Sequence, residues 1–237
     1  LQEGSVTDDT RIRAALPTLR YLVDHHARVV IVSHLGRPKG EPDPQYSLRP
    51  VRRVLSRLLG RNVHFVDQTV GPDVTEAVER MVDGEIVMLE NTRFDPGEKA
   101  NDPAFARKLA DLADIYVNDA FGAAHRAHAS TTGVADYLPA YAGMLLSREV
   151  ETLTDLMTNP ERPFVAILGG SKVSDKFGVI DRLLEVVDTL IIGGGMCFTL
   201  LVAKGVDVGK SLVEDEWVEP AKDMLKKASA GKLTKRH

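Results

Sequence analysis

The feature that most constrains the fold is an alternation along the chain of short apolar runs and amphipathic helical patterns. Most of the runs are continuously apolar and rich in β-branched residues, which is typical of strands buried on both faces of a parallel sheet. They lie at residues 29–32, 63–66, 85–89, 114–117, 164–168 and 189–192. Helical patterns separate them, including residues 9–24, a segment from the cap candidate Ser47 to Gly60, and a segment that Asp102 opens. The alternation predicts an α/β protein with doubly wound parallel sheets.

One candidate domain boundary is visible. Residues 145–157 read as an amphipathic helix, and the polar, proline-containing loop 158–163 follows it. Arg is the dominant basic residue before Pro163 and Lys is dominant after it, and only Arg offers a planar fork for bidentate binding of carboxylate or phosphate. We predict a first domain at residues 1–146, an interdomain helix and linker at 147–162, and a second domain at 163–237.

Composition excludes several classes of function. The formal net charge is −4, which argues against bulk attraction to nucleic acid or to an anionic membrane. No apolar run reaches the roughly 18 to 20 residues of a membrane-spanning helix, and we expect no membrane partner. Cys197 is the single cysteine, so an internal disulfide is excluded and a reducing cytoplasm is expected.

Basic side chains follow three of the predicted strands. Arg37 lies in the loop at residues 33–40 together with His34, Arg93 follows the third run, and Arg126 follows the fourth. Ligands of open α/β sheets bind beyond the carboxyl ends of the strands, so we expect these side chains at one edge of one sheet. Arg11, near the start of the first helix, could join them. Taken alone, the loop at 33–40 is equally consistent with a surface turn.

Two further patterns, one of histidines and one of glycines, resemble known kinds of binding site. His34, His125 and His128 could hold a metal such as zinc, but no Cys, Asp or Glu cluster stands beside them at a recognised spacing, so we predict no metal site. Residues 205–211 resemble a phosphate-binding loop but have three residues between the glycines, where the motif needs four.

The second half begins with a run of glycine and lysine after a predicted strand. In residues 168–176, a glycine pair precedes Lys172 and Lys176, which we place on one face at a helix start, where free N–H groups favour phosphate. A second glycine turn, at residues 193–196, follows the next predicted strand and suits close approach of the backbone to a flat ligand.

Together these motifs resemble the phosphoglycerate kinase family. The matching segments are 7–12, 33–40, 89–94, 117–130, 168–176 and 191–196, in the family's order, and the resemblance covers roughly residues 5 to 227. It implies two α/β domains of the phosphoglycerate kinase type, the second incomplete, joined by a hinge helix. It also implies a cytoplasmic monomer that transfers a phosphoryl group between 1,3-bisphosphoglycerate and MgADP, giving 3-phosphoglycerate and MgATP.

The resemblance also assigns roles to residues. A patch for the phosphoglycerate corresponds to Arg11, His34, Leu35, Gly36, Arg37, Arg93 and Arg126. Nucleotide contacts correspond to Gly170, Ser171, Lys172, Asp175, Lys176 and Gly194. Arg11 and Lys172 are the catalytic candidates, and Mg²⁺ is expected to bind with ATP or ADP. Because the acyl phosphate is already activated, catalysis requires positioning and charge neutralisation rather than a covalent nucleophile.

The sequence departs from the family at both ends. The family's first strand, with its D-x-N-x-P loop, would precede Leu1, and the W-N-G-P and G-G-G-D-[ST] segments of the nucleotide domain are not present. Residues 231–237 read as a polar basic tail without a pattern. We therefore expect a fragment with weak or no kinase activity. The alternatives are a non-catalytic anion-binding fragment and a nicotinamide-dependent oxidoreductase, which is disfavoured because no acidic residue follows a proper glycine fingerprint.

Overall fold

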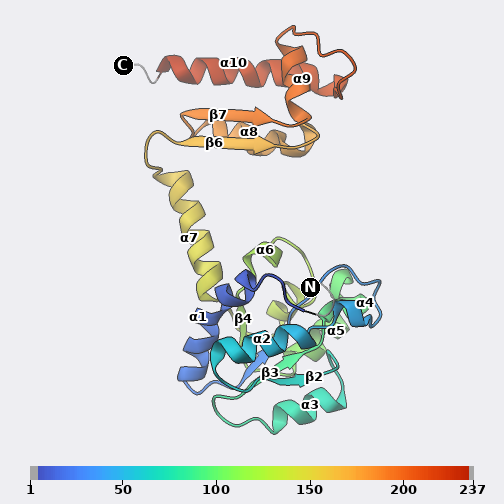
Figure 1. Ribbon diagram of the computed structural model, residues 1–237. Coiled ribbons are helices and arrows are strands. Elements are labelled where there is room, and N and C mark those ends of the chain that lie inside the picture. Colours follow the sequence, from blue (N-terminus) through green and yellow to red (C-terminus); the bar gives the residue numbers. More distant parts are fainter. Residues whose placement is uncertain (1–4, 235–237) are drawn as a thin grey trace. The chain divides into compact units, whose positions relative to one another are not determined.

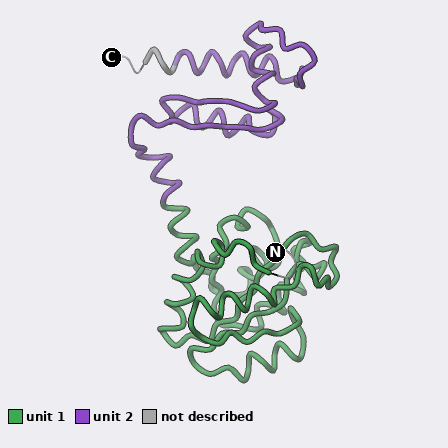
Figure 2. The backbone as a smooth tube through the Cα atoms, viewed as in Figure 1, with its two compact units in different colours: residues 1–151 green, residues 152–237 purple. Residues whose placement is uncertain are grey.

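The computed structural model describes residues 5–234, and side chains as far as residue 230. The chain divides into two compact units, Leu1–Glu151 and Thr152–His237, and the division falls within helix α7, Met144–Thr158 (Figure 2). Strands and helices alternate within both units (Figure 1). The helices are α1 Thr10–Asp24, α2 Arg49–Leu59, α3 Pro72–Glu79, α4 Pro96–Ala100, α5 Pro103–Ala110, α6 Phe121–Ala124, α7, α8 Phe177–Leu184, α9 Met196–Ala203 and α10 Val218–Thr234. The strands are β1 Val29–Ile31, β2 His64–Val66, β3 Ile86–Leu89, β4 Tyr116–Asn118, β5 Ala140–Ala142, β6 Val165–Gly169 and β7 Thr189–Gly193.

The main sheet of the first unit has β3 at its centre, between β1 and β2, and both pairings are parallel. All four residues of β3 are buried because helices cover both faces. Ile86 and Met88 pack into the cluster that contains residues of α1 and α2, while Val87 and Leu89 pack into the cluster that contains residues of α3. The continuously apolar run at β3 therefore follows from burial on two faces.

Two expectations about the first unit are wrong in detail. Strand β4 does not join the three-stranded sheet; within the described residues it pairs in parallel with β5, a strand that the sequence did not reveal. Helix α2 begins at Arg49, and Leu48, rather than Ser47, holds its N-cap position. Ser47 still serves the first turn, because its Oγ accepts a hydrogen bond from the Arg49 N–H at 3.2 Å.

The second unit contains the parallel pair β6 and β7. Its core combines Ile180 of α8, Met196 and Leu200 of α9, and Ala221 and Met224 of α10. Burial along β6 and β7 is partial, unlike the expected burial on both faces, and Ile167 of β6 is 74% exposed. Helix α10 extends to Thr234, so part of the segment expected to be a patternless tail is helical, and residues 235–237 lie outside the described part.

No helix in the described range, residues 5–234, has both the length and the apolar composition that would be needed to cross a membrane.

Candidate functional site

The first site lies beyond the carboxyl ends of β1 and β3. These strands are parallel neighbours, so the loop at 33–40 and the 3₁₀ turn Thr92–Phe94 leave the sheet at the same edge. A backbone hydrogen bond joins the two segments there, from the Thr92 N–H to the Ser33 carbonyl at 3.0 Å.

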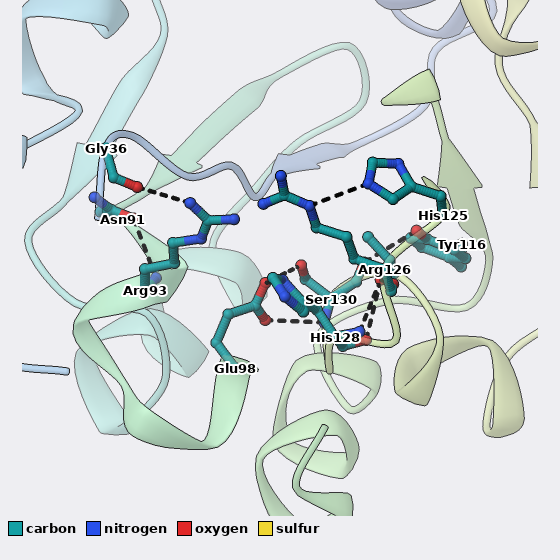
Figure 3. Close-up of polar contacts among 10 residues, drawn as sticks. Gly36, Asn91, Arg93, Glu98, Tyr116, His125, Arg126, His128 and Ser130 are labelled. Carbon is teal, nitrogen blue, oxygen red and sulfur yellow. Dashed lines mark hydrogen bonds and ion pairs between the residues drawn. The ribbon is translucent and has the colours of Figure 1, made fainter. Parts of the chain in front are cut away.

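Asn91 ties these two segments together, and its side chain is fully buried. The Nδ2 group donates to the carbonyl of Leu35 at 2.8 Å and to the carbonyl of Tyr46 at 2.9 Å. The Oδ1 atom accepts from the Arg93 N–H at 3.1 Å (Figure 3). Both donor hydrogens and the oxygen of this amide are used to fix the backbone that carries Leu35, Tyr46 and Arg93.

Arg93 is buried although it is cationic, and only 5% of its surface is exposed. Its Nη1 donates to the Gly36 carbonyl at 2.7 Å, while its buried Nε has no hydrogen-bond partner. Burial, and then the charge of Arg126, hold the pKa of Arg93 below its usual value. A buried guanidinium with an unused donor is a ready binding group for an anion.

Gly36 is required by the turn that faces Arg93. Its φ is +63°, and a Cβ there would lie 2.4 Å from two ring carbons of Tyr46. Any other residue would push the Tyr46 ring away and strain the backbone. The Gly36 carbonyl that receives Arg93 is therefore set by a conformation that glycine tolerates.

The segment after β4 brings a third arginine to the cluster. Arg126 follows α6, and its Nε lies 3.4 Å from the Nε2 of His125. Within residues 5–234, the ion pairs include none formed by Arg11, Arg37, Arg93 or Arg126. The guanidinium groups keep their charge available for a ligand.

His34 shows how strongly these groups affect one another. Its pKa is lowered to about 4, mainly by burial and then by the charges of Arg93, His128, Arg126 and Arg11. The imidazole is therefore neutral at pH 7, beside three arginines. Arg37 belongs to the same cluster, because its charge lowers the pKa of Arg93. The structure thus brings together the predicted basic side chains from three loops and α1, while Gly36 contributes its carbonyl and the side chain of Leu35 packs against the core beside α1 and α2.

Two residues of this site were missed by the sequence analysis. Glu98 of α4 is fully buried, and its carboxylate accepts hydrogen bonds from the N–H and the hydroxyl of Ser130 (Figure 3). His128 had been considered only as a metal ligand. Its Nδ1 instead lies 3.5 Å from Glu98 Oε1, and the described part of the chain contains no group of three metal-binding side chains.

The second site is formed by two glycine turns at the carboxyl ends of β6 and β7. Gly194 has a φ of +70°, and a Cβ on it would lie 2.7 Å from the Gly170 carbonyl oxygen. A Cβ on Gly195 would lie 3.0 Å from the Ser171 carbonyl oxygen. The Met196 N–H donates to the Gly170 carbonyl at 2.9 Å. The two turns are in direct contact, and only residues without side chains allow it.

The lysines of this unit differ from their predicted placement. The 3₁₀ turn Ser174–Lys176 precedes α8, and Lys172 lies in the loop before that turn, so Lys172 and Lys176 do not share an α-helical face. The N–H groups expected to bind phosphate there are also partly used. Glu214 accepts from Val173 N–H at 2.6 Å and Ser174 N–H at 3.1 Å.

Glu214 is the missed residue of the second site. Its other oxygen accepts from the Ser174 hydroxyl at 2.5 Å, and this hydrogen bond is the main reason why its pKa is lowered. The Lys172 charge lowers the pKa further. Glu214 therefore fixes the loop that carries Lys172. Because it occupies the N–H groups of Val173 and Ser174, the glycine turns are the backbone that a ligand can approach in this site.

A magnesium site made by protein residues alone does not fit these residues. Mg²⁺ prefers six oxygen ligands in an octahedral arrangement. Asp175 is the only acidic side chain among the predicted nucleotide contacts, and no group of three acidic or other metal-binding side chains occurs in the described range.

The comparisons with known proteins identify the family. The sequence profile described as phosphoglycerate kinase matches residues 1–235. A phosphoglycerate kinase of Moorella thermoacetica is 61% identical over 229 residues, which cover 97% of this chain and 58% of the relative. A phosphoglycerate kinase of Rubrobacter xylanophilus is 59% identical over 226 residues, covering 95% of this chain and 57% of that protein.

Solved structures agree with this assignment. The structure of phosphoglycerate kinase from Coxiella burnetii matches with a TM-score of 0.83 at 43% identity and covers 98% of this chain. The crystal structure of the enzyme from Pyrococcus horikoshii OT3 matches with a TM-score of 0.76 at 31% identity and likewise covers 98%. This chain covers 58% of each of those chains. A match over nearly all of its residues, in sequence and in structure, shows that the chain belongs to the phosphoglycerate kinase family.

Proposed function

We propose that this chain provides the phosphoglycerate site and part of the nucleotide site of a kinase that transfers a phosphoryl group between 1,3-bisphosphoglycerate and MgADP. The observation that carries the proposal is the arginine cluster. Arg93 is buried with an unused donor, and the neighbouring Arg37 and Arg126 have no carboxylate partner among residues 5–234. Arginines held together without ion-pair partners favour a small ligand that carries several negative charges.

In this proposal the arginines bind and orient the phosphoglycerate. Arg37, Arg93 and Arg126 neutralise its phosphate or carboxylate, and neutral His34 offers a hydrogen bond without adding charge. Arg11 is the proposed catalytic cation on this side, because it lies close enough to affect the pKa of His34. These side chains stabilise charge on the reacting oxygens and need no covalent intermediate.

The glycine turns of the second unit are proposed to bind the nucleotide. Gly170 and Gly194 allow backbone to approach the ligand closely, while Ser171, Asp175 and Lys176 would make the polar contacts. Lys172 is the proposed cation for the transferring phosphoryl group. When bound, Mg²⁺ would neutralise nucleotide phosphate charge, and it would arrive with the nucleotide, since these residues do not form a magnesium site of their own.

Calorimetry on two variants tests this division of roles. We expect Arg37→Ala to weaken binding of 3-phosphoglycerate about tenfold or more, since a hydrogen bond to a charged group contributes about 1.5–3 kcal/mol. Lys172→Ala should weaken ADP binding and leave 3-phosphoglycerate binding unchanged. Arg80→Ala, an exposed arginine paired with Glu76, is the control and should change neither affinity.

The same measurements separate the alternatives. Loss of 3-phosphoglycerate binding in Arg37→Ala with unchanged nucleotide binding in Lys172→Ala would favour a non-catalytic anion-binding module. Binding of NAD without binding of ADP would favour an oxidoreductase. Binding of neither 3-phosphoglycerate nor ADP by the wild-type chain would contradict the proposal.

We further propose that this polypeptide by itself turns over weakly, because it spans 57–58% of the length of the curated relatives it matches. A coupled assay on this polypeptide that gave near-normal turnover would contradict this. The monomeric state and the cytoplasmic location stay predictions, which size-exclusion chromatography and cell fractionation would check.

A further inference from the structure

Glu98 is a fully buried charged group in the first site that the proposed chemistry does not use. It lies in α4, whose first turn is capped by Asp95 Oδ1, which accepts from the Gly97 N–H at 2.8 Å. An ionised carboxylate is costly to bury unless hydrogen bonds or opposite charges compensate it. Such a residue in a binding site requires a specific explanation.

The side-chain contacts of Glu98 that the structure shows lie in one short segment of the loop after β4. One carboxylate oxygen accepts from the Ser130 N–H at 3.0 Å, and the other accepts from the Ser130 hydroxyl at 2.7 Å. The Glu98 carbonyl accepts from the Ala129 N–H at 2.9 Å. The Nδ1 of His128 lies 3.5 Å from Oε1 (Figure 3). Residues 128–130 are thus anchored on Glu98.

The anchored segment is tied to the backbone of Arg126. The hydroxyl of Thr131 donates to the Arg126 carbonyl at 2.7 Å, and the hydroxyl of Tyr116 donates to the Ser130 carbonyl at 3.0 Å. Burial, and then the negative charge of Glu98, raise the pKa of Tyr116 to about 12, so this donor keeps its proton. The loop that carries Arg126 is therefore held by the two Ser130 donors on the Glu98 carboxylate and by two hydroxyl groups on backbone carbonyls.

The charge of Glu98 opposes the cations that surround His128. Arg93 from the turn after β3, Arg126 from the same loop and His34 from the loop after β1 are positive or can become so. Burial, Arg93 and Arg126 favour the neutral form of His128, and Glu98 favours the protonated form. A phosphate bound to the arginines would offset their lowering of the His128 pKa. The charge of Glu98, which favours the protonated form of His128, would then act without that opposition.

We propose that Glu98 is a positioning residue of the phosphoglycerate site, which anchors the Arg126 loop and provides the buried negative charge against which His128 takes up a proton from solvent when the ligand binds. The inference rests on the proposed function for the identity of the ligand. Because Nδ1 of His128 faces the carboxylate at 3.5 Å, the proposal assigns the proton of the neutral imidazole to Nδ1 and the incoming proton to Nε2. The bound ligand then meets one more cation.

Glu98→Gln removes the negative charge of this side chain and keeps its shape. The amide oxygen can accept from the Ser130 N–H while the NH₂ group donates to the Ser130 hydroxyl, so the anchor is kept and the charge is removed. Ser130→Ala does the reverse, because it removes one hydrogen bond and keeps the carboxylate. Glu85→Gln, a half-buried glutamate that accepts from the Val82 N–H, is the matched control.

The first measurement is an NMR titration of the histidines without ligand, in which loss of one signal in His128→Gln identifies His128. We expect Glu98→Gln to lower the pKa of His128 by about one unit or more, as loss of a close opposite charge should. Ser130→Ala and Glu85→Gln should shift it by less than about half a unit. An unchanged titration of His128 in Glu98→Gln would overturn the inference.

The second measurement is calorimetry with 3-phosphoglycerate at pH 7 in two buffers of different ionisation enthalpy, which counts the protons taken up. The wild type should take up a fraction of a proton, and His128→Gln and Glu98→Gln should take up less. The same uptake in His128→Gln would overturn the inference even if Glu98→Gln failed to fold. Absence of binding by the wild type would refute the proposed function instead, and the ligand-free titration would still decide the effect of Glu98.

Discussion

At the scale of single residues, the first site depends on a few buried polar groups whose hydrogen bonds join backbone from different segments. Asn91 is the clearest case, since its amide holds two carbonyl groups and one N–H from different segments. A surface asparagine exchanges such bonds with water at little cost. In a fully buried position water cannot replace them, so removal of the amide leaves three backbone groups without partners.

Asn91→Ala should therefore destabilise the first unit by about 2–4 kcal/mol, the range for breaking a buried hydrogen-bond network. Asn62→Ala is the control, because Asn62 is exposed and its side chain hydrogen-bonds to the ring of the exposed His64; a change within about 0.5 kcal/mol is expected. Hydrogen exchange of the β3 amides under native conditions measures the change in unfolding free energy of the first unit in both variants. Equal protection in the two variants would show that the amide of Asn91 does not hold the loops together.

At the scale of elements, strands were the most predictable feature of the sequence. The six apolar runs all contain strands, because Val and Ile in short continuous stretches indicate burial in a parallel sheet. Strand β5 was missed because Ala140–Ala142 has no β-branched residue and is exposed throughout. Glu98 and Glu214 were missed because their partners lie 32 and 40 positions away, and local pattern says nothing about such contacts.

Turns made by glycine were predictable as turns, but their mutual contact was not. The contact between the Gly170 and Gly194 turns depends on the parallel register of β6 and β7, in which Gly169 is aligned with Gly193. That register places the two loops at the same level beyond the strands. Each turn therefore restricts the side chain that the other can carry.

Gly194→Ala tests this contact. The added Cβ would lie 2.7 Å from the Gly170 oxygen at a positive φ, so we expect a loss of about 1–3 kcal/mol in the second unit and weaker ADP binding. Gly178→Ala is the matched control, since Gly178 lies within α8 with open space around it. That change should be neutral or stabilise by about 0.5–1 kcal/mol. Fluorescence of the single tryptophan, Trp217, follows unfolding of this unit. Equal stability of both variants would rule out the steric argument.

At the scale of the whole molecule, each compact unit carries its own binding chemistry. The arginine cluster is formed by residues of the first unit, and the two glycine turns belong to the second. Each site is positioned by a separate core, around β3 in the first unit and around α8, α9 and α10 in the second. Each ligand should therefore stabilise mainly the unit that binds it.

Hydrogen exchange with mass spectrometry on the wild-type chain measures this separation directly. 3-Phosphoglycerate should protect residues 33–37, 91–93 and 125–131, because its charge fixes three loops whose arginines have no ion-pair partner, and should leave residues 169–176 unchanged. ADP should give the opposite pattern, with protection at 169–176 and 193–196. Inorganic phosphate at matched ionic strength controls for general screening. Protection of the glycine turns by 3-phosphoglycerate alone would mean that the two sites do not act as separate binding centres.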